Sequence, residues 1–291
     1  MAETRRVKKV WKSKPVTEGA GVHLRRAFGF NEVPQLDPFL LLDDFRSNAP
    51  AEYERGFPWH PHRGMETITY VLAGDVEHAD SLGNRGVIGA GDVQWMTAGS
   101  GIIHQEMPKG DREGRMWGFQ LWANLPARHK MMDPRYQEVK REDIPLAETA
   151  DGARVRVISG EVAGVRGPVR EIVTEPEYLD VSLPPGRTFT HALKPTHTVF
   201  AYVIEGEGYF DPERDPNSAC GNHTLVVYGP GDTVVVSTEE QPVPFLLVAG
   251  RPLEEPVAWY GPIVMNTQAE LRIAFREYEQ GTFVKRARPK G

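Results

Sequence analysis

The sequence predicts an all-β protein built from two antiparallel β-barrel domains, and three observations lead to this prediction. Short runs rich in Val, Ile, Thr and aromatic residues recur between turn signals, a spacing typical of β-sandwiches and barrels. The 24 prolines and 29 glycines are scattered along the chain, which suits many short strands better than long helices. A short motif at residue 70 also returns near residue 202, as expected for two related domains.

The individual elements follow from the local pattern. The strands predicted in chain order are residues 67–72, 92–96, 154–158, 199–204, 225–228 and 233–236. Helical periodicity is weak until residues 268–278, where Leu271, Ala274, Phe275 and Tyr278 fall at mixed helical spacing. The sequence therefore predicts one short C-terminal helix after the strands.

The repeated motif indicates where the domains divide. The letters YVLAG at 70–74 resemble YVIEG at 202–206, and each copy is followed by a Gly-Asp pair that would open another strand. Residues 131–150 between the copies are charged, contain two prolines and show no clear strand. We therefore expect an N-terminal domain of residues 1–135 and a C-terminal domain of residues 136–291.

Composition excludes several classes of protein. The net charge is −6, from 34 basic and 40 acidic residues, which argues against direct nucleic-acid binding or an anionic membrane surface. No apolar run approaches the roughly 20 residues that span a bilayer, and no hydrophobic segment follows the basic N-terminus. Cys220 is the single cysteine, so no internal disulfide is possible. We expect a cytoplasmic protein, with nuclear access if the source is eukaryotic.

Two pairs of side chains in the first half have the spacing of a metal site. His60 and His62 form one pair at i and i+2, and His104 and Glu106 form a second. Alternate residues of a strand point to the same face, so adjoining strands would bring three imidazoles and one carboxylate together. Imidazole and carboxylate ligands suit divalent first-row metals, and the donors alone do not select one. A rival carboxylate, Glu66, follows the first pair.

The stretch HPHRGMETITYVLAGDVEHADSLGNRGVIGAGDVQWMTAGSGIIHQE resembles the signature of the pirin family in the cupin superfamily. The stretches HTVFAYVIEGEGYF and AGRPLEEPVAWYGPIVMNT resemble the C-terminal domain of the same family, so the resemblance covers most of the chain. It implies two cupin (jelly-roll-like) barrels packed face to face, with one Fe(II) in the N-terminal domain. The family's three histidines and one glutamate match His60, His62, His104 and Glu106. Cupins in general use the spacing that Glu66 satisfies, whereas pirins take the carboxylate from the second motif. Glu66 is therefore expected to support the ligands, and His78 to be a polar residue of a hairpin.

The second domain is predicted to lack metal ligands. Carrying the repeat offset across places Ala192, Lys194, Pro244 and Leu246 at the four ligand positions. None of these side chains is a metal ligand, so one metal per chain is expected.

The resemblance implies two alternative functions. Pirins of the quercetin 2,3-dioxygenase type act on a flavonol, a small aromatic substrate, together with O2, and Glu106 would then serve as the general base. The alternative is a non-enzymatic, metal-dependent regulator that binds a protein partner, such as a transcription factor or a metabolic enzyme. An arginine-bearing surface would suit such a partner, and an apolar pocket would suit the flavonol. The candidate surface residues are Arg26, Arg55 and Arg63, and the candidate pocket residues are Phe57, Trp59, Met65, Trp95 and Met96.

Overall fold

The structure is a computed structural model that describes residues 3–31, 36–215 and 217–285, and these fall into two compact units. Unit 1 combines the N-terminal residues up to Lys14 with Glu142–Pro252. Unit 2 combines Pro15–Arg141 with the residues from Leu253 onward. The main junction, at Arg141, lies near the boundary predicted at residue 135. The two ends of the chain, however, are exchanged relative to a simple two-part division. The N-terminal residues belong to the unit that contains Glu142–Pro252, and the residues from Leu253 onward belong to the unit that contains Pro15–Arg141.

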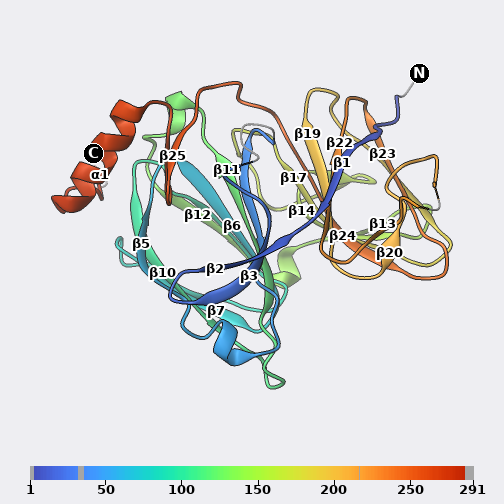
Figure 1. The fold of residues 1–291 in the computed structure, drawn as a ribbon, viewed down its shortest axis with the longest axis horizontal. Helices are drawn as coiled ribbons and strands as arrows, with labels where there is room; N and C mark the ends of the chain where they lie inside the picture. Colours follow the sequence, from blue (N-terminus) through green and yellow to red (C-terminus); the bar gives the residue numbers. More distant parts are fainter. Residues whose placement is uncertain (1–2, 32–35, 216, 286–291) are drawn as a thin grey trace. The chain divides into compact units, whose positions relative to one another are not determined.

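Unit 2 contains two main antiparallel sheets (Figure 1). The seven-stranded sheet has the order β12–β9–β6–β11–β4–β3–β2, and the four-stranded sheet has the order β5–β10–β7–β8. The strands are β2 (Lys14–Glu18), β3 (Val22–Phe28), β4 (Phe39–Asp44), β5 (Phe57–His62), β6 (Met65–Ala73), β7 (Asp75–Asp80), β8 (Arg85–Ile88), β9 (Val93–Thr97), β10 (Ile102–Lys109), β11 (Trp117–Asn124) and β12 (Arg135–Val139).

The last segment of the chain adds a hairpin and the predicted helix to unit 2. Strands β25 (Ala258–Tyr260) and β26 (Ile263–Met265) pair with each other, and α1 (Gln268–Glu279) follows. The helix begins at a capping box, in which the Thr267 side chain accepts from the backbone of Glu270 and the Glu270 side chain accepts in return. Within the described residues, no helix is long and apolar enough to cross a membrane. Short 3-10 helices occur at η1 (Pro50–Glu52), η2 (Ala127–His129) and η3 (Arg141–Asp143).

Unit 1 has a seven-stranded sheet of order β1–β22–β19–β24–β17–β14–β13, together with three two-stranded sheets, β18–β23, β15–β16 and β20–β21. The first strand of the chain, β1, pairs antiparallel with β22 at one edge of the large sheet (Figure 1). The strands are β1 (Val7–Lys12), β13 (Leu146–Glu148), β14 (Arg154–Ser159), β15 (Glu161–Val162), β16 (Val165–Arg166), β17 (Glu177–Leu183), β18 (Thr188–Ala192), β19 (Thr198–Val203), β20 (Glu207–Gly208), β21 (Cys220–Gly221), β22 (Thr224–Tyr228), β23 (Thr233–Ser237) and β24 (Val243–Gly250).

The prediction of an all-β chain with two cupin domains and a C-terminal helix is confirmed, but the barrels are not closed. In unit 2 the hydrogen-bonded ladders end at β12 and β2 in one sheet and at β5 and β8 in the other. Each sheet therefore keeps two edges, and the unit is a pair of sheets of the jelly-roll kind.

The internal repeat is real, but its extension to the positions of His104 and Glu106 was wrong. Strand β6 lies between β9 and β11, and β19 lies between β22 and β24, so the two YV motifs hold the same place. The two Gly-Asp pairs do not hold the same place in the fold, because one precedes β9 and the other precedes β23. Strand β23 pairs with β18 as β10 pairs with β5, which makes it the counterpart of β10. Pro244 and Leu246 lie on β24, the counterpart of β11.

Candidate metal centre

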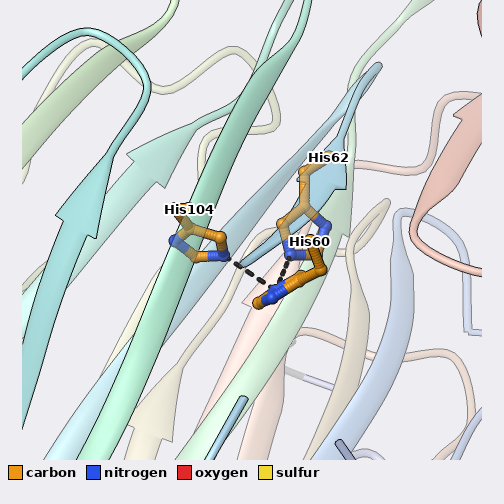
Figure 2. Close-up of side chains that lie close together, drawn as sticks. All are labelled: His60, His62 and His104. Carbon is orange, nitrogen blue, oxygen red and sulfur yellow. Dashed lines mark hydrogen bonds between the residues drawn. The ribbon is translucent and has the colours of Figure 1, made fainter. Parts of the chain in front are cut away.

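The three histidines of the two motifs meet between β5 and β10. These strands pair antiparallel with His104 opposite His60, so His60, His62 and His104 share one face. The Nε2 atom of His60 lies 3.0 Å from Nε2 of His62 and 3.0 Å from Nε2 of His104. Figure 2 shows the three rings directed toward one another. Within the part of the chain that the structure describes, this is the one group of three or more ligand-type side chains whose donor atoms all lie within 4.8 Å.

These distances fit a shared metal ion. Ligand nitrogens at about 2.1 Å from a metal and at right angles to each other are about 3.0 Å apart. The Nδ1 atom of His60 lies 2.8 Å from the carbonyl oxygen of Pro58, which favours a proton on Nδ1 and a free lone pair on Nε2.

Burial keeps two of the imidazoles neutral. Desolvation, followed by the neighbouring imidazoles, lowers the pKa of His62 well below its usual value. Desolvation is also the main cause that lowers the pKa of His104 to about 4. Neutral imidazole is the form that binds metals, so these rings offer lone pairs at neutral pH without first losing a proton.

Glu106 lies beside the three histidines. Its Oε2 is 3.9 Å from Nε2 of His104, and the carboxylate is buried, with 4% of the residue exposed. A register shift between His104 and Glu106 brings Glu106 opposite Phe57 of β5. Glu106 is not a member of the group within 4.8 Å, so the structure brings together three of the four predicted ligands and holds the fourth close by.

The rival carboxylate, Glu66, lies on another face of the unit. It occupies β6 three residues before Thr69, which faces Glu106, so alternation directs Glu66 to the opposite side of the sheet. Its Oε1 accepts a 2.6 Å hydrogen bond from Thr97 Oγ1. Desolvation raises the pKa of Glu66, and the hydrogen bond from Thr97 and the charge of Arg135 only partly oppose this rise.

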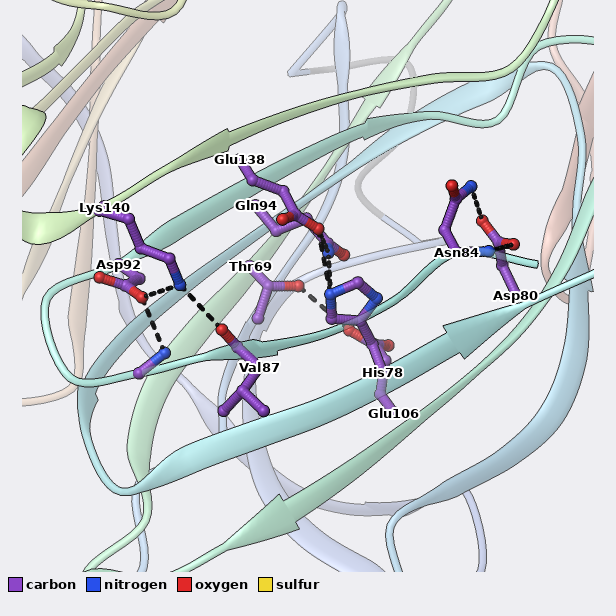
Figure 3. A network of polar contacts seen from close by, with 11 residues as sticks. Thr69, His78, Asp80, Asn84, Val87, Asp92, Gln94, Glu106, Glu138 and Lys140 are labelled. Atoms are coloured by element: carbon purple, nitrogen blue, oxygen red, sulfur yellow. Dashed lines mark hydrogen bonds and ion pairs between the residues drawn. The ribbon is translucent and has the colours of Figure 1, made fainter. Parts of the chain in front are cut away.

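His78 belongs to a separate polar network. It lies opposite Glu106 on β7, but its Nε2 is 3.0 Å from Gln94 Nε2 and 3.1 Å from Glu138 Oε1 (Figure 3). The ring also stacks on Tyr136 at 6.2 Å. His78 is therefore a polar residue of the β7–β8 hairpin, as the sequence predicted, and its polar partners lie on the facing sheet.

A cavity of about 700 Å³ opens onto the candidate centre. Its wall includes His60, His62 and Glu106, and most of the remaining wall is apolar. The principal apolar and aromatic wall residues are Val22, Leu24, Phe30, Leu41, Phe45, Phe57, Val76, Trp122 and Trp259. A concave, mostly apolar space with a few convergent polar groups is typical of a small-molecule site.

The predicted pocket residues are only partly correct. Phe57 lines the cavity, whereas Trp59 is 51% exposed and does not. Met65, Trp95 and Met96 are fully buried core residues and do not line the cavity. Trp122 and Gln120 also line the cavity and were not predicted, although the alternation of residues 117–124 places both on one face of β11.

The predicted arginine surface is wrong for Arg63. This side chain is 1% exposed, and it donates to the carbonyl oxygens of Ser100 (2.7 Å) and Phe283 (2.8 Å) and pairs with Glu277 at 2.7 Å. Arg63, which directly follows His62, therefore links this part of the chain to the C-terminal segment.

Arg26 and Arg55 have different positions. Arg26 lines the cavity and forms a two-point pair with Asp43, at 2.8 Å for each hydrogen bond. Desolvation raises the pKa of Asp43 to about 6 despite this partner. Arg55 is exposed.

Family models for pirin and for the pirin C-terminal cupin domain match residues 21–123 and 178–284. A pirin-like protein of Solanum lycopersicum is 45% identical over 276 residues, which cover 94% of this chain and 91% of that protein. The chain belongs to the pirin family. Pirin of Homo sapiens is 42% identical over 268 residues, covering 91% of this chain and 89% of the human protein. Among solved pirin-like folds, quercetin 2,3-dioxygenase from Acinetobacter baumannii has a TM-score of 0.86 at 33% identity and covers 96% of this chain and 98% of that one.

Proposed function

We propose that this pirin is an iron-dependent dioxygenase of the quercetin 2,3-dioxygenase type, with His60, His62, His104 and Glu106 as metal ligands. The observation that carries the proposal is the convergence of three imidazoles, with Nε2 separations of 3.0 Å, at the wall of a largely apolar cavity. The similarity to the Acinetobacter baumannii enzyme supports the same reaction class. The single, buried Cys220 is consistent with the cytosol as the proposed compartment.

Bound Fe(II) would supply open coordination positions for a flavonol and O2 and would lower the energy of electron transfer between them. The chain's own residues supply the rest. Phe57, Trp122 and Trp259 offer flat aromatic faces for the flavonol rings and exclude water from them. A single carboxylate beside three neutral imidazoles leaves a divalent site with a net charge near +1, which favours the deprotonated flavonol.

Glu106 is the proposed general base. It lies in the cavity wall and is positioned to accept the proton of the flavonol 3-hydroxyl group at a carboxylate oxygen. Overall, O2 adds both of its atoms to the ring-opened product, and one ring carbon leaves as carbon monoxide.

The test uses the purified full chain, loaded with Fe(II) without oxygen and then mixed with quercetin and O2. We expect loss of the quercetin absorbance band, O2 uptake and carbon monoxide release in equal amounts. Glu106→Gln should lower kcat at least about a hundredfold, within the usual range for general bases. The matched control is Glu66→Gln, a second buried carboxylate that does not face the cavity, and it should keep most activity.

Two outcomes would contradict the dioxygenase proposal. One is metal-loaded protein that shifts the quercetin band but consumes no O2, which would instead favour the metal-dependent regulator. The other is turnover that Glu106→Gln leaves unchanged. Elemental analysis of freshly purified protein tests the choice of iron directly.

A further inference from the structure

The carboxylate of Glu106 accepts hydrogen bonds from side chains of the sheet that faces its own. Glu106 lies on β10 of the four-stranded sheet, whereas Thr69 and Gln120 lie opposite each other on β6 and β11 of the seven-stranded sheet. Thr69 Oγ1 donates to Glu106 Oε1 at 3.1 Å (Figure 3). Gln120 Nε2 lies 3.2 Å from Oε1 and 3.1 Å from Oε2 of the same carboxylate. These contacts leave Oε2 as the oxygen nearest to His104, at 3.9 Å.

Trp122 fixes which way the Gln120 amide points. The indole N–H can only donate, and Trp122 Nε1 lies 2.9 Å from Gln120 Oε1. The amide oxygen must therefore face Trp122, and the NH2 group must face Glu106. A flipped amide would place two donors together at Trp122 and an oxygen against the carboxylate.

The same indole also contacts the candidate centre and the cavity wall. The Trp122 ring meets the His62 ring edge-on, with centroids 5.2 Å apart and an interplanar angle of 88°. The centroid of the Trp122 ring also lies 6.1 Å from that of the Trp259 ring. Trp122 is thus in contact with a proposed ligand, with the group that orients Glu106, and with the wall that a flavonol would touch.

We propose that Gln120 is the positioning residue of Glu106 and that Trp122 sets the orientation of Gln120. This inference rests on the proposed metal site, and it assigns roles to side chains that are not ligands themselves. Hydrogen-bond donors on a carboxylate fix its direction, and a metal ligand needs a fixed direction. A cavity occupant that displaces the Trp122 ring would also disturb the hydrogen bond that orients Gln120.

The experiment measures metal binding without flavonol or oxygen. Co(II) is titrated into metal-free protein, and the visible d–d bands report both the dissociation constant and the coordination. The variants are Gln120→Met, which keeps the length of the side chain, and Trp122→Phe, which keeps an aromatic ring but removes the N–H. Thr69→Val provides an independent removal of a donor to Glu106. Trp117→Phe is the matched control, because Trp117 is on the same strand and donates to Asn48 at 2.7 Å.

We expect Gln120→Met to weaken Co(II) binding about 10- to 100-fold, as is typical for partners of metal ligands. Its d–d spectrum should shift in the same direction as that of Glu106→Gln. Trp122→Phe should show a smaller shift of the same kind, and Trp117→Phe should match the unchanged protein. Circular dichroism confirms that each variant is folded, and Thr69→Val takes the place of any variant that is not.

The outcomes separate this inference from the proposed function. If the folded Gln120→Met and Thr69→Val variants bind Co(II) with unchanged affinity and spectrum, the positioning role is wrong while the metal site stands. If the parent protein binds no Co(II), or if His104→Ala does not alter binding, both proposals fail. If the variants behave as expected but the iron-loaded protein consumes no O2 with quercetin, the positioning role holds and the dioxygenase proposal fails.

Discussion

Units 1 and 2 share an arrangement of strands, but their interiors differ: that of unit 1 is filled with packed side chains, whereas that of unit 2 holds a cavity. In unit 2, β6 lies between β9 and β11, and β5 pairs with β10; in unit 1, β19 lies between β22 and β24, and β18 pairs with β23. Strand β10 carries His104 and Glu106, whereas β23 has the sequence TVVVS. Strand β18, the counterpart of β5, carries His191, which lies opposite Val234 of β23.

Packing explains what each interior can do. In unit 1, the Phe245 ring meets Phe189 at 6.0 Å and Phe210 at 5.2 Å, and all three are fully buried. In unit 2, the corresponding region holds the cavity of about 700 Å³. His191 of unit 1 is paired with Glu177 at 2.7 Å, so it is not directed at other imidazoles. The comparison shows that the fold provides a place for a site, and that a few inward side chains decide whether the place is used.

The largest expected effect is on metal affinity. Structural zinc sites with four ligands bind their metal with about 10–16 kcal/mol, so loss of one proposed ligand in His104→Ala should cost about 4 kcal/mol, a thousandfold change. His191→Ala makes the same change on the counterpart strand pair of unit 1 and should leave the affinity unaltered. The measurement is a Co(II) titration of both variants, and equal losses would contradict the distinction between the units.

The next effect is on stability, and it compares a ring in the filled interior of unit 1 with a ring in the cavity wall of unit 2. Phe189→Ala should lower the free energy of unfolding by about 3–4 kcal/mol, because it leaves a void among packed rings. Phe57→Ala removes a half-buried ring from the cavity wall and should cost about 1 kcal/mol, because no enclosed void forms. Urea unfolding followed by circular dichroism compares the two. A larger loss for Phe57→Ala would show that the cavity is closed in solution.

A buried carboxylate gives unit 2 a pH dependence that Asp43→Asn should remove. Burial raises the pKa of Asp43 from 3.8 to about 6 in the folded chain, so the folded state binds more protons than the unfolded state between these values. Its stabilising contribution is complete below pH 3.8 and is lost as the pH rises through about 6. Relative to Asp43→Asn, the unaltered protein should lose about 2–3 kcal/mol of stability between pH 4 and pH 7. A difference between the two proteins that does not change with pH would refute the raised pKa.

The smallest effect concerns the helix, which has no α-helical counterpart among the described residues of unit 1. Thr267→Ala removes the side chain that caps α1 and should cost about 1 kcal/mol, whereas Thr267→Ser keeps the hydroxyl group and should cost little. Thermal unfolding measures both. Limited proteolysis should also cut Thr267→Ala earlier within α1, and equal cleavage of the two variants would argue against a capping role.

Much of the fold could be predicted because its signals are local. The β-branched runs of β6, β19 and β23, and the capping residues of α1, lie within a few positions of one another in the sequence. The convergence of His60, His62 and His104 was also predictable, since it needs only strand alternation and one pairing. Metal binding through these residues and Glu106 remains a prediction.

The rest depends on contacts that sequence spacing does not encode. Alternation places Gln120 and Trp122 on one face of β11, but it does not show that this face meets Glu106. The cavity wall at Trp259 comes from a segment far along the chain, after all of unit 1. The repeat gave wrong counterparts for His104 and Glu106 because loop lengths differ between the two halves. The Gly-Asp pair precedes β9 in one half and β23 in the other, and these strands are not counterparts.

The exchange of chain ends has a consequence for biosynthesis. A ribosome completes His60, His62, His104 and Glu106 early, then makes Glu142–Pro252, and only afterwards makes Trp259. The cavity therefore stays without one wall until Trp259 has been made, while β1, made before the rest of unit 1, waits for its partner β22. Neither unit can be released by a single cut in the polypeptide: a fragment that ends at the Arg141 junction lacks the wall of one unit and leaves the other without its edge strand.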